Sequence, residues 1–268
     1  MPYQTVTDIQ IYYELHGPEN ADLIVFSNGI FMSTASWGFQ IAEIKRHFRV
    51  LVYDCRGMWK SDHPVGPYSM EQHADDLANL LTELGIQKAH IAGISYGGEI
   101  SMVFACKYPE RVRSLIISSA VSQIDPMLNA IGKSWMGSLQ SGDPGTMFDV
   151  TMTANFSEDW IASHGPLLEA TRKRYDQMDM KAATELMIAF TKIDFTKDLK
   201  KITSPTLVLV GELDNLKPRK YAEIITNEIA GSEFLVIPHA GHAVCLEQPA
   251  SFNSVILGFV LKHCEVVG

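Results

Sequence analysis

Hydrophobic and polar positions along the chain predict short buried strands separated by longer helices. Several apolar runs are continuous rather than alternating, which is typical of strands that helices cover on both faces of a parallel sheet. The first two strands are too close in the chain for a crossover connection, so we expect them to form an antiparallel hairpin. The predicted strands are Thr5–Val6, Ile9–Leu15, Leu23–Ser27, Val50–Asp54, Ala89–Ile94, Ser114–Ser118, Thr206–Gly211 and Phe234–Ile237.

Helical periodicity is clearest over Met70–Leu84, where the apolar side chains fall on one face. Ser69 is a suitable N-cap for this helix, and Gly85 is a suitable residue just past its end. We also expect a helix from Gly97 to about residue 108 and another over Phe252–Lys262. Strands that alternate with helices in this way predict an α/β fold with a mostly parallel sheet.

Residues 122–196 interrupt this alternation. They contain helical pieces, such as Leu167–Met178 and Met180–Phe190, but no good strand. The segment is too long for a loop, so we expect a helical insertion between two strands of the sheet. The chain then divides into a core domain, residues 1–121 and 197–268, and an inserted cap, residues 122–196.

Composition and charge narrow the class of partner. With 46% hydrophobic and 20% charged residues, the composition is that of an ordinary globular protein. The net charge of -9 at pH 7 disfavours nucleic acid and anionic membranes as partners. We find no signal peptide, no membrane span and no metal-ligand spacing among the four cysteines. We therefore expect a cytoplasmic monomer or homodimer that acts on a small molecule without a metal or cofactor.

The candidate nucleophile lies in Gly93-Ile94-Ser95-Tyr96-Gly97, directly after a predicted strand and before a predicted helix. A Gly-x-Ser-x-Gly nucleophile elbow needs this context, because the turn strains the serine backbone and leaves room only for small neighbours. Gly93 and Gly97 supply that room. The first turn of the following helix then points at any charge that develops beside Ser95.

With this motif, the chain resembles the α/β-hydrolase superfamily over nearly its full length. The resemblance implies an α/β-hydrolase fold: a mostly parallel eight-stranded sheet, helices on both faces and a helical cap inserted after strand 6. It also implies a triad in the chain order serine, acid, histidine. Asp214 matches the acid, in Gly-Glu-Leu-Asp after a buried strand, and His242 matches the histidine, in a Gly-His turn after the last strand.

Other residues compete for these roles. Asp125 follows the preceding strand, where some family members carry the acid, and it is the alternative to Asp214. Glu212 lies two residues too early and is expected to be a loop residue. His239 lies three residues before His242, but zinc sites need three or four ligands and no other cluster supplies them. We expect His239 to be a loop residue as well.

The predicted mechanism is acyl transfer. His242 accepts the Ser95 proton, Asp214 fixes its tautomer, and an acyl-enzyme forms and is hydrolysed. Two backbone N–H groups should bind the oxyanion, those of Tyr96 and Ile30. Ile30 ends the loop Ser-Asn-Gly-Ile, where many relatives have His-Gly, and the asparagine resembles the 3-oxoadipate enol-lactonase branch.

The predicted cap is rich in methionine, with seven of the twelve methionines of the chain. Methionine suits a pocket for varied apolar groups, although most of these side chains can equally attach the cap to the sheet. Trp37, just past the oxyanion loop, and Trp135 in the cap are the predicted pocket residues. Trp59 replaces a glycine that is common in relatives, so its loop cannot adopt glycine-only dihedrals without strain. This side chain either packs on the loop surface or lines the pocket.

We therefore predict a serine hydrolase that cleaves an ester or lactone of a small, largely apolar molecule, and that is similar to enol-lactonases. No arginine pair or lysine cluster suggests an anionic substrate. A carbon–carbon bond hydrolase acting on a diketone and a slow-turnover receptor for a ligand are the alternatives, because both would carry the same triad.

Overall fold

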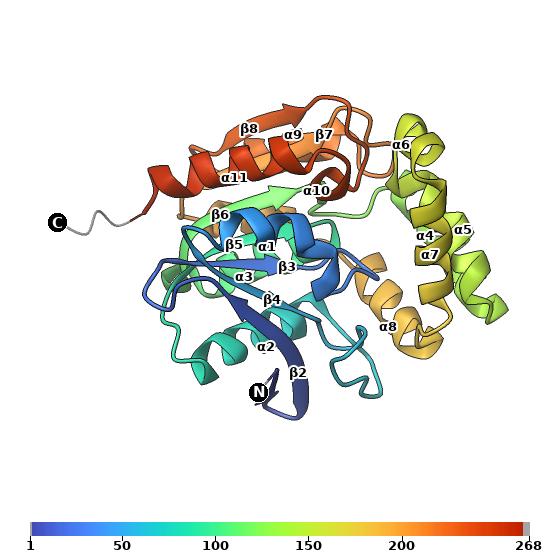
Figure 1. The fold of residues 1–268 in the computed structure, drawn as a ribbon, viewed down its shortest axis with the longest axis horizontal. Coiled ribbons are helices and arrows are strands. Elements are labelled where there is room, and N and C mark those ends of the chain that lie inside the picture. The colour runs from blue at the N-terminus through green and yellow to red at the C-terminus, as the bar shows by residue number, and fades with distance from the viewer. Residues whose placement is uncertain (1, 265–268) are drawn as a thin grey trace.

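The computed structural model describes residues 2–264, and its centre is an eight-stranded sheet in the order β1-β2-β4-β3-β5-β6-β7-β8 (Figure 1). The predicted hairpin is present, since β1 and β2 pair antiparallel, and β2 also pairs antiparallel with β4. All the other neighbours are parallel. The strands are β1 (Tyr3–Val6), β2 (Ile9–His16), β3 (Leu23–Ser27), β4 (Arg49–Tyr53), β5 (Ala89–Ile94), β6 (Val112–Ser118), β7 (Thr206–Gly211) and β8 (Glu233–Ile237).

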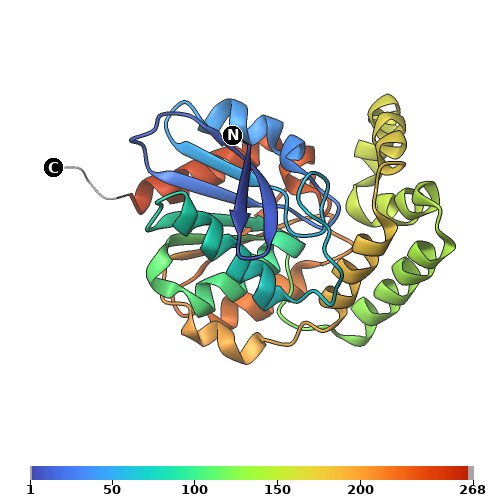
Figure 2. The same ribbon diagram turned by 90° about the horizontal axis from the view of Figure 1, so that it is seen from below.

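Helices cover both faces of the sheet (Figure 2). On one face α1 (Gly38–Ile44) packs against α11 (Pro249–Lys262), and together they bury a core that includes the side chains of β3 and β4 that point to this face. On the other face lie α2 (Met70–Glu83), α3 (Tyr96–Lys107) and α9 (Arg219–Glu228). The central strands β3, β5 and β7 are buried along their whole length, which is why their sequences are continuous apolar runs.

The predicted ends of α2 are present. The Ser69 hydroxyl accepts a hydrogen bond from the N–H of Gln72, and Gly85 adopts a positive φ of 70° just past the last turn. An α-helix leaves its first N–H groups without partners, so a serine here stabilises the start of the helix.

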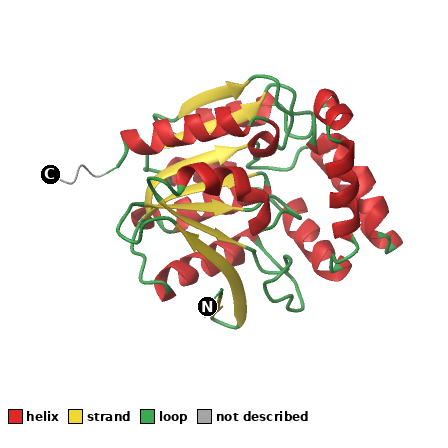
Figure 3. Cartoon of the chain, viewed as in Figure 1, coloured by secondary structure: helices red, strands yellow, loops and turns green. Residues whose placement is uncertain are grey.

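Five α-helices lie between β6 and β7, and we call them the inserted helices. They lie beyond the ends of the strand arrows of the parallel sheet (Figure 3). The fold class is therefore the predicted one, an α/β-hydrolase fold with a helical insertion after the sixth strand; the proposed domain limits stay a prediction. The inserted helices are α4 (Pro126–Ser141), α5 (Pro144–Asn155), α6 (Glu158–Ser163), α7 (Gly165–Tyr175) and α8 (Met180–Thr191).

The remaining helices are short. They are the 3-10 helices η1 (Thr34–Trp37), η2 (Pro109–Arg111) and η3 (Thr196–Lys201), and the four-residue α10 (Val244–Glu247) just before α11. Within residues 2–264, no helix combines the length and the apolar composition that crossing a bilayer requires.

Candidate active site

Ser95 lies in the sharp turn between β5 and α3. Its backbone has φ 52° and ψ -121°, a strained conformation for a residue with a side chain. The turn is crowded: a Cβ atom on Gly93 would lie 2.1 Å from the Gly97 carbonyl oxygen, and one on Gly97 would lie 2.0 Å from that of Ser27. The two glycines of the motif therefore provide the space that the sequence analysis assigned to them.

Asp214 and His242 form a buried pair in the loops that follow β7 and β8. The Asp214 Oδ2 atom lies 2.9 Å from His242 Nδ1. Oδ1 of the same carboxylate accepts the N–H groups of Leu216 and Lys217, at 3.0 and 2.8 Å. Burial raises the pKa of Asp214, but the neighbouring His242 and these backbone donors outweigh it and hold the pKa below its ordinary value. The carboxylate is thus ionised and oriented toward the imidazole.

The alternative acid and the neighbouring loop residues lie elsewhere. Asp125 is the N-cap of α4, where it accepts the N–H of Leu128 and pairs with Lys220 at 2.8 Å. Burial raises the pKa of Asp125, but hydrogen bonds from the Leu128 N–H, Lys220 and Tyr221 together outweigh it and lower the pKa to about 2. Glu212 accepts the backbone N–H of His239 at 3.0 Å. These residues contribute to loop and helix structure, as predicted for Glu212 and His239.

Ser95 and His242 line the same cavity, but within residues 2–264 no hydrogen bond joins their side chains. The Ser95 hydroxyl instead accepts a hydrogen bond of 3.2 Å from the ammonium group of Lys217. The same ammonium lies 2.7 Å from Glu99 Oε1, and both side chains of this ion pair are buried. No motif of the sequence indicates that Lys217 or Glu99 belongs to the site.

Local structure explains how this ion pair reaches the nucleophile. Lys217 follows Asp214 by three residues, and the turn that orients the carboxylate also places the lysine. Glu99 lies in the first turn of α3, where its Oε1 atom also accepts the N–H of Val121 at 2.8 Å. Burial raises the pKa of Glu99, and Lys217 opposes this effect. Lys217 therefore lies in the same loop as Asp214, and Glu99 lies in the helix that begins directly after Ser95.

The loop after β3 passes beside Ser95, as the predicted oxyanion hole requires. A Cβ atom on Gly29 would lie 3.5 Å from Ser95 Cβ, and the next residue, Ile30, lines both cavities at the nucleophile. Tyr96 is the first residue of α3, so its N–H has no acceptor within the helix. The two predicted donors, Ile30 and Tyr96, therefore lie on the two segments that flank the serine.

Trp37 does not lie where we predicted it. Its ring is fully buried, packs against Phe26 at 4.7 Å between ring centres, and lines neither cavity at Ser95. The indole N–H donates to Asn28 Oδ1 at 2.7 Å, and the Asn28 amide donates to Asp54 at 3.3 Å. The position therefore contradicts a pocket role, because the side chain points behind the oxyanion loop and orients Asn28.

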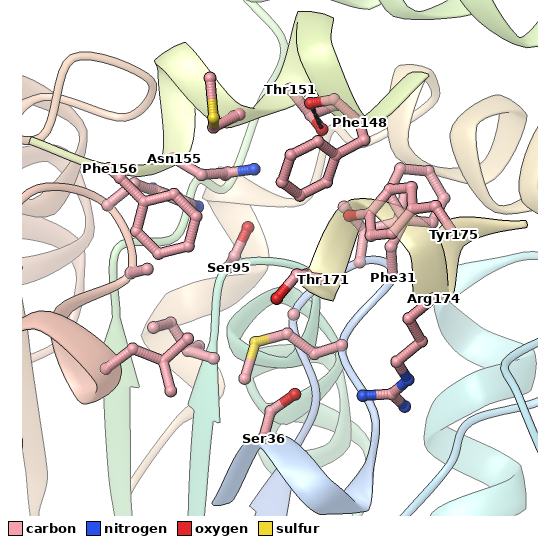
Figure 4. Close-up of a pocket in the computed structure, with 18 of the residues that line it drawn as sticks. Phe31, Ser36, Ser95, Phe148, Thr151, Asn155, Phe156, Thr171, Arg174 and Tyr175 are labelled. Atoms are coloured by element: carbon pink, nitrogen blue, oxygen red, sulfur yellow. Dashed lines mark hydrogen bonds between the residues drawn. The ribbon is translucent and has the colours of Figure 1, made fainter. Parts of the chain in front are cut away.

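Two cavities meet at Ser95. The larger, which we call the outer cavity, has a volume of ≈ 770 Å³ and includes His242. Figure 4 shows Asn155 and Phe156 of the inserted segment on one side of Ser95 and Arg174 beside Tyr175 on the other. The smaller, the inner cavity, has a volume of ≈ 340 Å³. The inner cavity is lined by Ile30, Ser95, Tyr96, Leu128, Ile131, Gly132, Trp135, Met187, Phe190, Leu216 and Lys217. Trp135, the second predicted pocket residue, thus lines the inner cavity.

Trp59 lines the outer cavity, which decides between the two positions that its sequence allowed. Its backbone has φ 44°, so the strain predicted for its loop is present. Two contacts fix the side chain: the indole N–H donates to the Phe31 carbonyl at 2.9 Å, and the Arg174 guanidinium lies 4.2 Å above the ring. Arg174 also donates to the Ser33 hydroxyl. A cation therefore lies at the wall of the outer cavity, and the sequence analysis did not anticipate it.

The histidine turn is attached to the inserted segment. The N–H of Ala243 donates to the Asn155 carbonyl at 2.9 Å. The Glu247 carboxylate of α10 accepts both the N–H and the hydroxyl of Ser157. A Cβ atom on Gly241 would lie 2.7 Å from the Ser157 nitrogen, so the two segments touch through their backbones. The residues next to His242 therefore pack directly against the chain between α5 and α6.

One group of possible metal ligands lies apart from the triad. The ligand atoms of Asp22, His90 and Cys264 lie within 4.8 Å of one another. His90 is near the start of β5, whereas Ser95 follows the end of that strand. Arg113 lies 3.7 Å from Asp22, and its positive charge disfavours a metal ion at this place. The group thus contributes nothing to the chemistry at Ser95.

The fold and the site agree with the family match. Residues 22–249 match the alpha/beta hydrolase fold family, and the chain belongs to this family. Protein relatives and a solved structure extend the likeness over almost the whole chain. The "Putative carbamate hydrolase RutD" of Pantoea ananatis is 28% identical over 260 residues, which cover 95% of this chain and 94% of the relative. The "3-oxoadipate enol-lactonase 1" of Acinetobacter baylyi is 28% identical over 250 residues, covering 92% and 91%.

Among solved structures, the chain is similar to MGS-M2, an alpha/beta hydrolase enzyme from a Medee basin deep-sea metagenome library. The TM-score is 0.92 at 29% identity, and the match covers 99% of each chain. The protein is thus a hydrolase by family, and its relatives differ in the bond that their names describe.

Proposed function

We propose that the protein is a serine hydrolase that cleaves an ester or lactone of a small, largely apolar molecule through an acyl-enzyme. The observation that carries the proposal is the position of Ser95, on a strained turn where two cavities meet, with the buried Asp214–His242 pair at the same cavity. The outer cavity is lined mostly by apolar and aromatic side chains with a few polar groups, as pockets for small molecules commonly are.

The proposed mechanism uses each of these residues. Because His242 Nδ1 faces Asp214, its Nε2 atom remains for the Ser95 proton. As the hydroxyl attacks the carbonyl carbon, the oxyanion accepts hydrogen bonds from the N–H groups of Ile30 and Tyr96. His242 then gives the proton to the leaving oxygen; an ester releases its alcohol, whereas an opened lactone keeps the new hydroxyl on the acyl group. Water, deprotonated by His242, hydrolyses the acyl group from Ser95.

The inserted helices are proposed to act as the cap that selects the substrate. They supply several aromatic and amide side chains of the outer cavity, including Phe148, Asn155 and Tyr175. The names of two relatives describe a lactone and a carbamate, and in both a carbonyl carbon is bonded to a leaving heteroatom. A carbamate is therefore the second candidate substrate class, because the same attack by Ser95 would cleave it.

The test is a turnover assay on p-nitrophenyl esters, lactones, aryl carbamates and a diketone. The wild-type protein is expected to hydrolyse an ester or lactone repeatedly, and Ser95→Ala should lose roughly 10³-fold or more in kcat/KM. Ser254→Ala, an exposed serine on α11, is the matched control and should keep full activity. Mass spectrometry of a quenched reaction should detect the acyl group on Ser95.

Four results would contradict the proposal of an ester or lactone hydrolase. Hydrolysis that survives in Ser95→Ala would show a different nucleophile. A single acylation that never turns over would favour a ligand receptor. Cleavage confined to the diketone would favour carbon–carbon bond hydrolysis, and cleavage confined to carbamates would favour the second candidate.

A further inference from the structure

The inner cavity combines an apolar wall with one buried ammonium group. Its lining includes aliphatic and aromatic side chains from α4 and α8, such as Leu128, Trp135 and Phe190. Lys217 extends into this lining, with only 3% of its surface exposed. A buried ammonium is costly unless it is paired and hydrogen-bonded, so its partners decide what the cavity can bind.

Two of the three N–H donors of Lys217 have partners, and the two hydrogen bonds differ in strength. Glu99 Oε1, at 2.7 Å, is the counter-ion, and it is fully buried. Ser95 Oγ, at 3.2 Å, is the longer and weaker contact. The Phe190 ring lies 4.9 Å from the ammonium on the cavity side. The donor that now faces Ser95 is therefore the one that a bound molecule can most easily take over.

We propose that Lys217 selects substrates whose acyl part carries a neutral oxygen acceptor, a carbonyl, ether or hydroxyl oxygen, a few atoms from the scissile carbonyl. This inference rests on the proposed function and names the acyl group that it favours. When such an oxygen enters the inner cavity, it accepts the Lys217 N–H in place of Ser95. The lone pair of the Ser95 oxygen that received this hydrogen bond is then free for attack.

Charge favours a neutral oxygen over a carboxylate. Glu99 already neutralises Lys217, so the ion pair as a whole carries no net charge. A substrate carboxylate would place two negative groups against one buried ammonium, and buried like charges repel strongly. Size favours a short acyl chain, because the free space in the inner cavity is only a small fraction of that in the outer cavity.

The experiment compares esters that share one leaving group. p-Nitrophenyl methoxyacetate and p-nitrophenyl butanoate have acyl groups of equal length that differ in one oxygen for one methylene. p-Nitrophenyl hydrogen succinate tests a carboxylate. Each kcat/KM is divided by the rate of hydrolysis by hydroxide, which removes the intrinsic difference in reactivity. The wild-type protein is expected to prefer methoxyacetate roughly tenfold or more over both other esters.

The decisive variant is the double substitution Lys217→Met and Glu99→Gln. Lys217→Met alone would leave the Glu99 carboxylate buried without its counter-ion, whereas glutamine keeps an acceptor for the Val121 N–H. The corrected preference for methoxyacetate over butanoate is expected to fall roughly ten- to hundredfold. Lys220→Met, which removes an exposed lysine paired with Asp125, is the control and should leave the preference unchanged.

The inference would be overturned if the corrected kcat/KM ratio of methoxyacetate to butanoate were near one in the wild-type protein. It would also be overturned if the double variant had the same ratio as the wild-type protein. A preference for the succinate ester would overturn it too. If a thermal melt shows that the double variant does not fold, the wild-type ratio of methoxyacetate to butanoate hydrolysis is the test of the inference. Failure here differs from failure of the proposed function: Ser95-dependent hydrolysis without any acyl preference would refute the selection by Lys217 only.

Discussion

The segments that carry Ser95, Asp214 and His242, which we call the triad loops, are packed more tightly than the inserted helices. Around Ser95, glycine positions have backbone atoms about 2 Å from where a Cβ would lie, and the Asp214 carboxylate has a partner on each oxygen. In the inserted helices, Gly137 has no atom within 4 Å of an added Cβ. α6 has no fully buried residue, and Arg172 pairs with Asp149 at the surface.

This difference separates two tasks. A reaction needs its groups within a fraction of an ångström, and tight backbone packing provides that. Selection of a substrate depends on cavity walls, which tolerate changes of side chain more readily. We therefore expect substitutions at the triad loops to cost far more than equal substitutions in the inserted helices.

The largest effect is expected for Asp214→Asn. The amide cannot stabilise the imidazolium of His242, and it favours the wrong tautomer, so kcat should fall roughly 10⁴-fold. That factor corresponds to about 5.4 kcal/mol of transition-state stabilisation. Asp125→Asn, which changes the N-cap of an inserted helix, is the matched control and should lower kcat less than twofold. A reversal of these two results would mean that Asp125 is the acid.

A smaller effect, on stability, is expected from one methyl group placed in each region. Gly93→Ala should lower the free energy of unfolding by about 3 kcal/mol, because the new Cβ would lie 2.1 Å from the Gly97 carbonyl oxygen. Gly137→Ala, within α4, should raise it by about 0.5–1 kcal/mol, because alanine is the better helix former. Urea unfolding measures both. Equal effects at the two sites would remove the contrast between the regions.

A third effect depends on pH and concerns His73, a buried residue of α2 on the sheet side of the molecule. Burial, with help from Arg56, lowers the pKa of His73 to about 3. Between pH 6.5 and about 3 the unfolded chain binds a proton at this residue and the folded chain does not, so stability falls as the pH falls. One such group contributes about 1.4 kcal/mol per pH unit.

His73→Gln should therefore flatten the acid side of the stability curve by up to that slope, measured by urea unfolding between pH 7 and 4. Gln72→Ala, the preceding position in the same helix, is a control without a titrating group. An unchanged slope in His73→Gln would show that His73 takes up its proton equally in both states.

Local signals made much of the site predictable. The strand, the two glycines and the helix that define the turn at Ser95 lie within a short stretch of sequence, and so do the strand and loop before Asp214. Trp37 was placed wrongly because its direction depends on Asn28 and Phe26, which no periodicity reveals. Lys217 and Glu99 are 118 residues apart, and their contact follows from the packing of the loop after β7 against the first turn of α3.

The position of the strained Trp59 also depends on a distant segment of the chain. Its sequence indicated strain, but the guanidinium of Arg174 that packs on it comes from a helix whose position a single sequence does not specify. The sequence thus does not predict the positions of side chains whose partners come from a distant part of the chain, and the structure reveals them.

The bonds from Ala243 to Asn155 and from Glu247 to Ser157 have a consequence for engineering. A chimaera that takes its inserted helices from a relative, with junctions only at residues 122 and 196, would separate these partners. The exchange unit has to include α10 and the turn before it, although they lie about 50 residues further along the chain. Recombination libraries that exchange both segments together should retain folded, active members more often than libraries that exchange residues 122–196 alone.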